Sequence, residues 1–167
     1  HQDAADFPEI QNNTRSLSWW KKTTPVILKF LPQQTQEILI SELKEQELFF
    51  NSSLYKSLPK AVVHADLFRD NALFVEQKEI KVSKTLKSTK KPHQPKEKLG
   101  GIIDFYFAGF DTLIYDLAVV ANDWAISHES NEIGSFKTNE LDYLLKGYQS
   151  VRTLTNSEME AWAMALR

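Results

Sequence analysis

The sequence predicts an α+β fold that is mostly helical and includes a small antiparallel sheet. Apolar residues recur at helical spacing over residues 32–50 and 139–151, which is typical of amphipathic helices. Two short apolar runs, Ala61–Val63 and Ile102–Ile103, are each followed by polar residues, which indicates buried strands that lead into a polar site. No internal repeat divides the chain, so we expect these elements to form one unit.

Bulk composition narrows the class of protein. The 167 residues are 42% hydrophobic, which is enough for the core of one domain or a large part of one. The net charge of -2 gives no overall field for nucleic acid or a membrane, and no apolar run approaches the roughly 20 residues that span a bilayer. Because there is no cysteine, disulfide scaffolds and zinc–thiolate sites are excluded, and a cytoplasmic location is expected. The oligomeric state stays open.

The first part of the chain predicts one long helix and two short strands. Trp19, Trp20 and Trp162 are expected in the core. Residues 1–25 are predicted to form a loop with a short helix, residues 32–50 a long helix and residues 51–59 a linker. Residues 61–63 and 71–76 are each predicted to form a strand.

A lysine-rich segment, residues 77–98, follows the second strand. Its 22 residues contain eight Lys and two Glu, a net charge of +6, which leaves -8 on the rest of the chain. Alternating apolar residues predict a hairpin ribbon, with Pro92 and Pro95 in its loop. The segment could be a basic patch for an acidic partner. We favour a solvated hairpin insertion, because no aromatic residues interleave with the lysines as they do in nucleic-acid grooves.

The last third predicts three further elements. Asp111 or Thr112 can cap a helix whose inner face would carry Leu113, Leu117, Ala121 and Trp124. A helix over 139–151 follows, and Thr155–Glu158 has the pattern of a capping box that opens another. The chain starts at His1 and stops at Arg167 in mid-pattern, so we expect a piece of a longer protein, cut at both ends.

Two polar clusters carry the chemistry. Asp66 and Asn71 follow the strand 61–63, and Asp104 ends the strand that begins at Ile102. If the strands on either side of the insertion pair, Asn71 and Asp104 approach the same point. A carboxylate and an amide oxygen suit Mg²⁺, and a second carboxylate beside the ion could accept a proton from a hydroxyl. The spacing Asp-x4-Asn is the one that the kinase catalytic loop uses.

Three stretches carry a family resemblance. They read VVHADLFRDNALF, GGIIDFYFAG and YDLAVVANDW, and a minor match is DFP at 6–8. In this order they resemble the aminoglycoside phosphotransferase and choline kinase superfamily, the small-molecule relatives of protein kinases. Within it, the set is most similar to the kinase-like homoserine kinases. The resemblance covers essentially the whole chain apart from the lysine-rich segment.

The resemblance implies roles for individual residues. Asp66 would be the catalytic base. Asn71 and Asp104 would bind Mg²⁺ and, through it, the nucleotide. His64 and Asp116 would support the catalytic loop.

A further group, Asn122, Asp123 and Trp124, would lie near the substrate pocket. The implied reaction is transfer of the γ-phosphoryl group of ATP to the hydroxyl of L-homoserine, in threonine biosynthesis. Two alternatives remain: a kinase for another small alcohol such as choline or an aminoglycoside, and a non-catalytic pseudokinase module that binds a partner. The choice of substrate rests on the resemblance.

The chain also departs from the family pattern. Its first glycine is Gly100, so there is no glycine-rich phosphate loop, and no strand in the first 60 residues resembles the one that carries the phosphate-binding Lys. We therefore expect a protein-kinase-like fold in which residues 1–167 form a single C-terminal lobe without most of the ATP cradle. Such a lobe would be inactive by itself.

Overall fold

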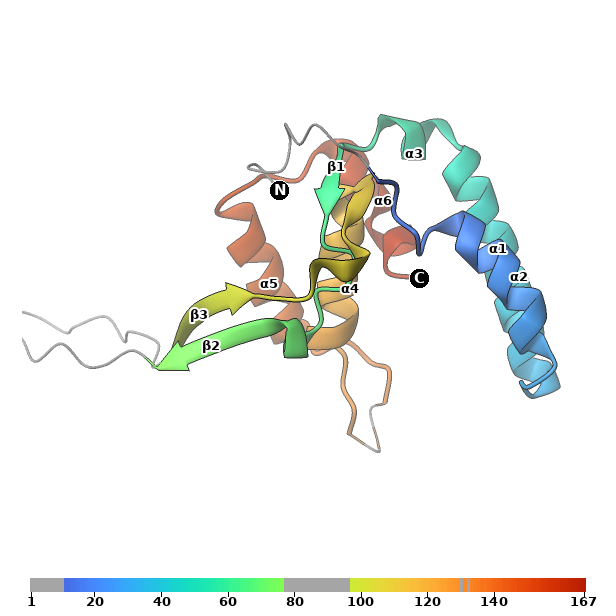
Figure 1. The fold of residues 1–167 in the computed structure, drawn as a ribbon, viewed down its shortest axis with the longest axis horizontal. Coiled ribbons are helices and arrows are strands. Elements are labelled where there is room, and N and C mark those ends of the chain that lie inside the picture. The colour runs from blue at the N-terminus through green and yellow to red at the C-terminus, as the bar shows by residue number, and fades with distance from the viewer. Residues whose placement is uncertain (1–10, 77–96, 130, 132) are drawn as a thin grey trace, which may run out of the picture.

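The computed structural model describes residues 11–76, 97–129, 131 and 133–167 (Figure 1). Its helices are α1 (Leu17–Leu28), α2 (Gln33–Asn51), α3 (Ser53–Ser57), α4 (Leu113–Trp124), α5 (Thr138–Gln149) and α6 (Asn156–Ala165). Its strands are β1 (Lys60–Val63), β2 (Ala72–Glu76), β3 (Glu97–Ile102) and β4 (Gly109–Thr112), with short 3-10 turns η1 (Arg69–Asn71) and η2 (Phe105–Phe107). The mixture of helices and small antiparallel sheets confirms the predicted α+β class.

Helix α4 lies at the centre of the molecule (Figure 1). Its first residue, Leu113, packs with the apolar side chains of β1 and with Ala65 beyond the strand. Ile114 packs on its other side against Leu58 and against Ala161 of α6. Three of the four residues predicted for its inner face, Leu113, Leu117 and Ala121, are buried. The helix therefore joins two apolar clusters, and it positions the loop that follows β1.

The four described strands form two separate antiparallel pairs and not a single sheet. β1 pairs with β4, in a register that runs from Lys60 opposite Thr112 to Val63 opposite Gly109. β2 pairs with β3 from Ala72 opposite Ile102 to the ends of both strands, and the register shifts once after Leu73. The second pairing was predicted, and it brings the turn at Asn71 beside the segment that leads to Asp104. The first pairing was not predicted, because β4 is short and has no alternating pattern.

The prediction that Asp111 caps α4 is wrong. Thr112 occupies the N-cap position of α4, but its side chain makes no capping bond. Asp111 lies in β4 and is buried. Its carboxylate accepts hydrogen bonds from Asn13 Nδ2 at 2.8 Å, from the Tyr55 hydroxyl at 3.2 Å and from the Thr112 N–H at 2.7 Å. The carboxylate thus ties the N-terminal segment and α3 to the β1–β4 pair.

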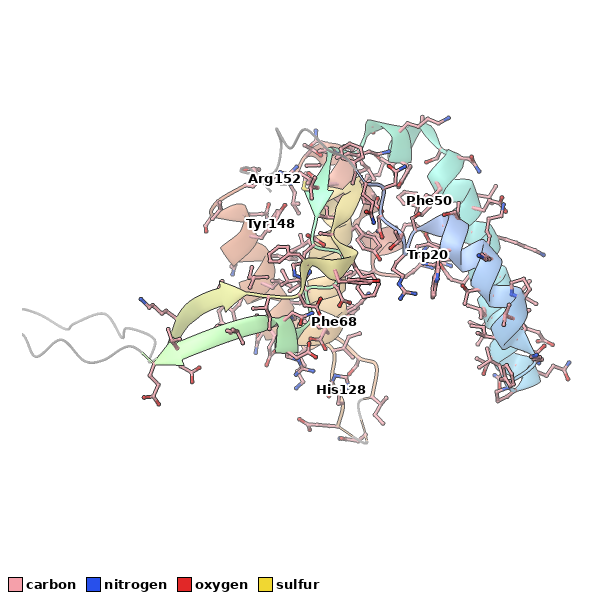
Figure 2. The ribbon with its side chains drawn as sticks, in the orientation of Figure 1. Trp20, Phe50, Phe68, His128, Tyr148 and Arg152 are labelled. Carbon is pink, nitrogen blue, oxygen red and sulfur yellow. The ribbon has the colours of Figure 1, made fainter. Side chains whose placement is uncertain are left out.

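Helices α1 and α2 form a pair at one side of the molecule (Figure 1). Trp20 of α1 and Phe50 of α2 meet edge to face with ring centres 5.6 Å apart (Figure 2). The predicted helix over 32–50 is confirmed within one residue at each end. Ile38 contributes to the apolar pattern that predicts α2, yet it is 63% exposed, since the contacts of α2 involve other parts of its surface.

The predicted capping box at the start of α6 is confirmed. The Thr155 hydroxyl accepts the N–H of Glu158, and the Glu158 carboxylate accepts the N–H of Thr155 at 2.8 Å. Arg152 also binds both oxygens of Glu158, at 2.9 and 3.0 Å. This ion pair joins the segment that follows α5 to the start of α6. Arg152 is labelled in Figure 2.

Two predictions concern residues outside the described ranges. The lysine-rich hairpin over 77–98 falls almost entirely on residues 77–96, and only Glu97 and Lys98 are described, as the start of β3. The minor motif at Asp6–Pro8 also lies outside them. Among the described helices, none combines the length and the apolar character that crossing a bilayer requires.

Candidate active site

Asp116 of α4 binds the backbone of the loop that follows β1. The Asp116 carboxylate accepts the His64 N–H on one oxygen and the Ala65 N–H on the other, each at 2.7 Å. Ala65 has a left-handed backbone with φ of 63°, a conformation that costs about 1–3 kcal/mol for a residue other than glycine. Burial raises the pKa of Asp116, and the two backbone N–H groups act against that rise. The carboxylate therefore fixes a strained turn immediately before Asp66.

His64 connects this loop to the segment before Asp104. Its Nε2 lies 2.9 Å from the Ile103 carbonyl oxygen, and the Asp66 N–H donates to its Nδ1 at 3.3 Å. Since Nδ1 accepts, the proton of a neutral ring lies on Nε2 and is donated to Ile103. The buried ring also contacts Phe105, with ring centres 4.6 Å apart. His64 thus connects the two segments, and both of its ring nitrogens are used in contacts with the backbone.

Asn71 closes the loop on Asp66. Its Nδ2 donates to the Asp66 carbonyl oxygen at 2.8 Å and lies 3.5 Å from Asp66 Oδ2. The Asn71 carbonyl oxygen accepts the Ile103 N–H at 3.0 Å, so this residue also binds the segment that carries Asp104. The amide is nearly buried, and its orientation is set by the bond to Asp66.

Asp104 follows β3 in a second left-handed turn, with φ of 63°. Its Oδ1 accepts the Tyr106 N–H at 3.4 Å and so starts η2. The side chain is exposed beside the Asp66 loop. Burial raises the pKa of Asp66, and the negative charges of Asp104 and Asp70 raise it further, while the positive charge of Arg15 acts in the opposite direction. The two carboxylates therefore lie within electrostatic reach of each other.

These residues fit a magnesium site. Because Asn71 Nδ2 donates to Asp66, its Oδ1 remains available as a ligand. Oδ1 and the Asp104 carboxylate are hard oxygen donors, and Mg²⁺ normally takes one or two carboxylates together with water and phosphate oxygens. Among the residues that the structure describes, no group of three or more His, Cys, Asp or Glu side chains forms a protein-only metal cage. An ion that the protein shares with phosphate oxygens, as in phosphoryl-transfer sites, suits Asn71 and Asp104 better than an ion bound by protein side chains alone.

The three residues predicted near a substrate pocket take different positions. Asp123 accepts the backbone N–H of Arg69 at 2.7 Å and forms an ion pair with its guanidinium group at 3.2 Å. Trp124 Nε1 lies 3.4 Å from the Leu67 carbonyl oxygen. Asn122 instead donates to the carbonyl oxygen of Leu166, beyond the end of α6. Asp123 and Trp124 therefore brace the loop on the side of Phe68 and His128, which Figure 2 labels.

An apolar cavity of about 590 Å³ lies beside the same loop. It opens between α4, α5 and the segments 62–67 and 102–108. His64 and Asp116 line it, but both use their polar atoms for the backbone bonds described above. Tyr143 and Tyr148 also line it, and the other described residues around it are mainly apolar.

One charged residue near the site was missed by the sequence reasoning. The Arg15 guanidinium carbon lies 4.6 Å from the ring centre of Trp19 and 4.6 Å from that of Phe107. Phe107 ends the turn that Asp104 begins. The pair Trp19–Trp20 was the available signal, but Phe107 lies too far from Arg15 in the sequence for a pattern to relate them.

With this geometry in hand, comparison with known proteins defines the class. Residues 94–154 match the phosphotransferase enzyme family. This match covers β3, the Asp104 turn, β4, α4 and α5, and it confirms the resemblance to the phosphotransferase superfamily.

The individual relatives are more specific. The chain is 41% identical over 168 aligned residues to a protein named homoserine kinase from Paraburkholderia xenovorans (strain LB400), and the match covers 100% of the chain and 46% of that protein. Proteins of the same name from Ralstonia nicotianae and Cupriavidus necator are 38% and 40% identical over 167 residues, which is 100% of the chain and 45% of each. The similarity to homoserine kinases is confirmed, and the chain spans about half the length of the curated relatives it matches.

Proposed function

We propose that the protein containing this chain transfers the γ-phosphoryl group of ATP to the hydroxyl of L-homoserine, a step of threonine biosynthesis. The 167 residues would form its C-terminal catalytic lobe. The observation that carries the proposal is the placement of Asp66, Asn71 and Asp104. Two adjoining turns present these side chains side by side, and buried backbone hydrogen bonds fix both turns.

Asp66 is suited to receive the proton of the acceptor hydroxyl. The loop bonds from Asp116 and Asn71 fix its backbone, so the carboxylate is oriented before the substrate binds. Its pKa, raised mainly by burial, makes it a better proton acceptor than an ordinary Asp. Most of the rate enhancement would come from this positioning and from electrostatics, because phosphoryl transfer asks little covalent chemistry of a protein.

Asn71 and Asp104 would hold Mg²⁺, which when bound offsets the charge of the ATP phosphates. The nucleotide itself would lie along the β2–β3 pair, where Leu73 and Ile102 expose apolar surface next to the two ligands. The rest of the ATP site would come from parts of the protein outside these 167 residues.

The test is ADP release by the complete protein with Mg-ATP and a panel of alcohols: homoserine, choline and an aminoglycoside. Release with homoserine alone supports the proposal. Release with choline or the aminoglycoside alone would keep the phosphotransfer chemistry and exclude the substrate. No release with any alcohol, together with no Mg-ATP binding, would favour the non-catalytic binding module.

A further inference from the structure

Arg15 lies in a segment that is built onto the site. The Asn13 N–H donates to the Phe110 carbonyl oxygen at 3.1 Å, and the Asn13 side chain donates to the buried Asp111. The backbone N–H of Arg15 in turn donates to Asn13 Oδ1 at 2.8 Å. A Cβ at Gly109 would lie 2.9 Å from the Asn13 nitrogen, so glycine permits this close approach. The position of Arg15 is therefore tied to β4.

The guanidinium group is also held in place. It lies between the rings of Trp19 and Phe107, 4.6 Å from each centre, which is the distance of a cation–π contact. Phe107 packs against the apolar cluster beneath the Asp66 loop. These two ring contacts do not use the guanidinium N–H donors, which can bind an anion.

Within the described part of the chain, Arg15 differs from the other arginines in having no carboxylate partner. The chain has four arginines, and three of them pair with Asp123, Glu158 and Glu42. Among the described residues, no carboxylate forms an ion pair with Arg15. Its contact with Phe107 places the guanidinium group at the turn that Asp104 begins. A guanidinium group held at this turn, with no carboxylate partner among the described residues, is suited to bind an anionic group of a substrate.

We propose that Arg15 binds the α-carboxylate of an amino-acid acceptor through a bidentate ion pair, and that Trp19 and Phe107 hold its guanidinium plane for this contact. The inference rests on the proposed function and extends it to substrate selection. Asp66 receives the hydroxyl proton at one end of the substrate, and Arg15 fixes the carboxylate at the other. Choline and aminoglycosides have no carboxylate, so this contact selects against them.

The experiment compares two acceptors on the complete protein. L-homoserine and 3-aminopropan-1-ol share a hydroxyl and an ammonium group, and only the first has a carboxylate. The variants are Arg15→Gln and Arg15→Lys, with Arg167→Gln as a matched control at an exposed arginine of the chain end. Steady-state kinetics give kcat and KM for each acceptor and for ATP. The amino alcohol is followed as a competitive inhibitor if its turnover is too slow.

Arg15→Gln should lower kcat/KM for homoserine by about 10- to 100-fold, the range expected for a lost charge-assisted hydrogen-bonded pair. Most of the loss should appear in the KM of homoserine, with the KM of ATP and the constants for 3-aminopropan-1-ol changing by less than about threefold. Arg15→Lys should retain part of the homoserine activity, because it keeps the charge and loses the planar fork. Arg167→Gln should leave all constants near wild type.

Three outcomes would overturn the inference. An equal loss with both acceptors would make Arg15 structural. A rise in the KM of ATP alone would assign Arg15 to the phosphates. Unchanged homoserine kinetics in Arg15→Gln would remove it from the site while leaving the proposed function intact. If the wild-type protein phosphorylates no amino-acid alcohol, the proposed function fails first, and the inference falls with it.

Discussion

The residues around Asp66 illustrate how a few buried bonds can support a strained site. Ala65 and Asp104 are the two non-glycine residues with positive φ among those described. Ala65 directly precedes the proposed base Asp66, and Asp104 is one of the two proposed Mg²⁺ ligands. At the first left-handed turn, the Asp116 carboxylate accepts the N–H groups of His64 and Ala65. At the second, the Asp104 carboxylate accepts the N–H of Tyr106. Such strain persists only where neighbouring contacts compensate it, and it concentrates at functional sites.

Replacing Asp66 by Asn should separate catalysis from binding. The backbone bond from Asn71 to the Asp66 carbonyl oxygen survives this change, so the loop should keep its shape. Loss of a general base lowers rates by about 10²- to 10⁴-fold, and we expect kcat with homoserine to fall by that amount in the complete protein. The KM of ATP should stay nearly constant. Asp70→Asn, at the exposed neighbouring carboxylate, is the control, and near-normal turnover in Asp66→Asn would remove Asp66 from its assigned role.

Tyr55 should make the protein sensitive to alkali. Burial raises the pKa of its hydroxyl, and the negative charge of Asp111 and the hydrogen bond to it raise the pKa further. The folded state therefore holds this proton more tightly than the unfolded state, where the pKa is about 10. Its contribution to stability is complete below about pH 10 and is lost as the pH rises beyond it. Thermal unfolding of the complete protein should show Tm falling less steeply above that pH in Tyr55→Phe, and parallel Tm curves would contradict the assignment.

The sequence predicted those site residues that lie close together in the chain or on strands joined by a hairpin. Asp66 and Asn71 lie on one loop, and the pairing of their strand with the one before Asp104 followed from the intervening hairpin pattern. Arg15 could not be found in this way, because its partner Phe107 is distant in sequence and reaches it only through tertiary packing. Asp111 was misassigned for the same reason, since its partners Asn13 and Tyr55 come from separate segments.

Among the secondary-structure elements, strong periodicity predicted α2, α5 and the capping box of α6, while weak or short patterns failed. Helix α1 contains Pro25 in its interior, and a proline usually argues against a helix there because it removes a backbone donor. β4 has four residues and starts with Gly109, so its pairing with β1 depends on tertiary contacts. Trp19, which we expected in the core, is 38% exposed, since it belongs to neither apolar cluster and contacts Arg15 instead.

The junction between α5 and α6 should depend on Arg152. Glu158 is fully buried, with 0% of its surface exposed, and Arg152 binds both of its oxygens. Arg152→Met would leave that carboxylate buried without its cation, which typically costs about 3–5 kcal/mol. Lys146→Met removes an exposed pair with Asp142 on α5 and should cost less than about 0.5 kcal/mol. Urea unfolding of the complete protein measures both, and equal effects of the two substitutions would show that the Arg152 pair contributes no more than a surface pair.

For the whole molecule, the main feature is that the proposed metal ligand Asp104 lies on an exposed surface of the described residues. Asp104 is exposed, and around it the β2–β3 pair and η2 expose large apolar side chains, including Phe74, Leu99, Phe105 and Tyr106. In Figure 1 this ribbon extends away from α4 and the helices around it. The relatives are about twice as long as the chain, and a phosphoryl-transfer site needs water excluded and the phosphates held from several sides.

We therefore expect the isolated 167-residue chain to release no ADP in response to homoserine under conditions in which the complete protein does. The chain supplies Asp66, Asn71 and Asp104, but its first glycine is Gly100, so it offers no glycine-rich loop to cover the nucleotide. Circular dichroism of the isolated chain should first establish that its helices are formed. The remainder of the protein, added as a separate polypeptide, should then restore part of the activity. Turnover by the isolated chain would show that these residues bind and position ATP without further parts of the protein.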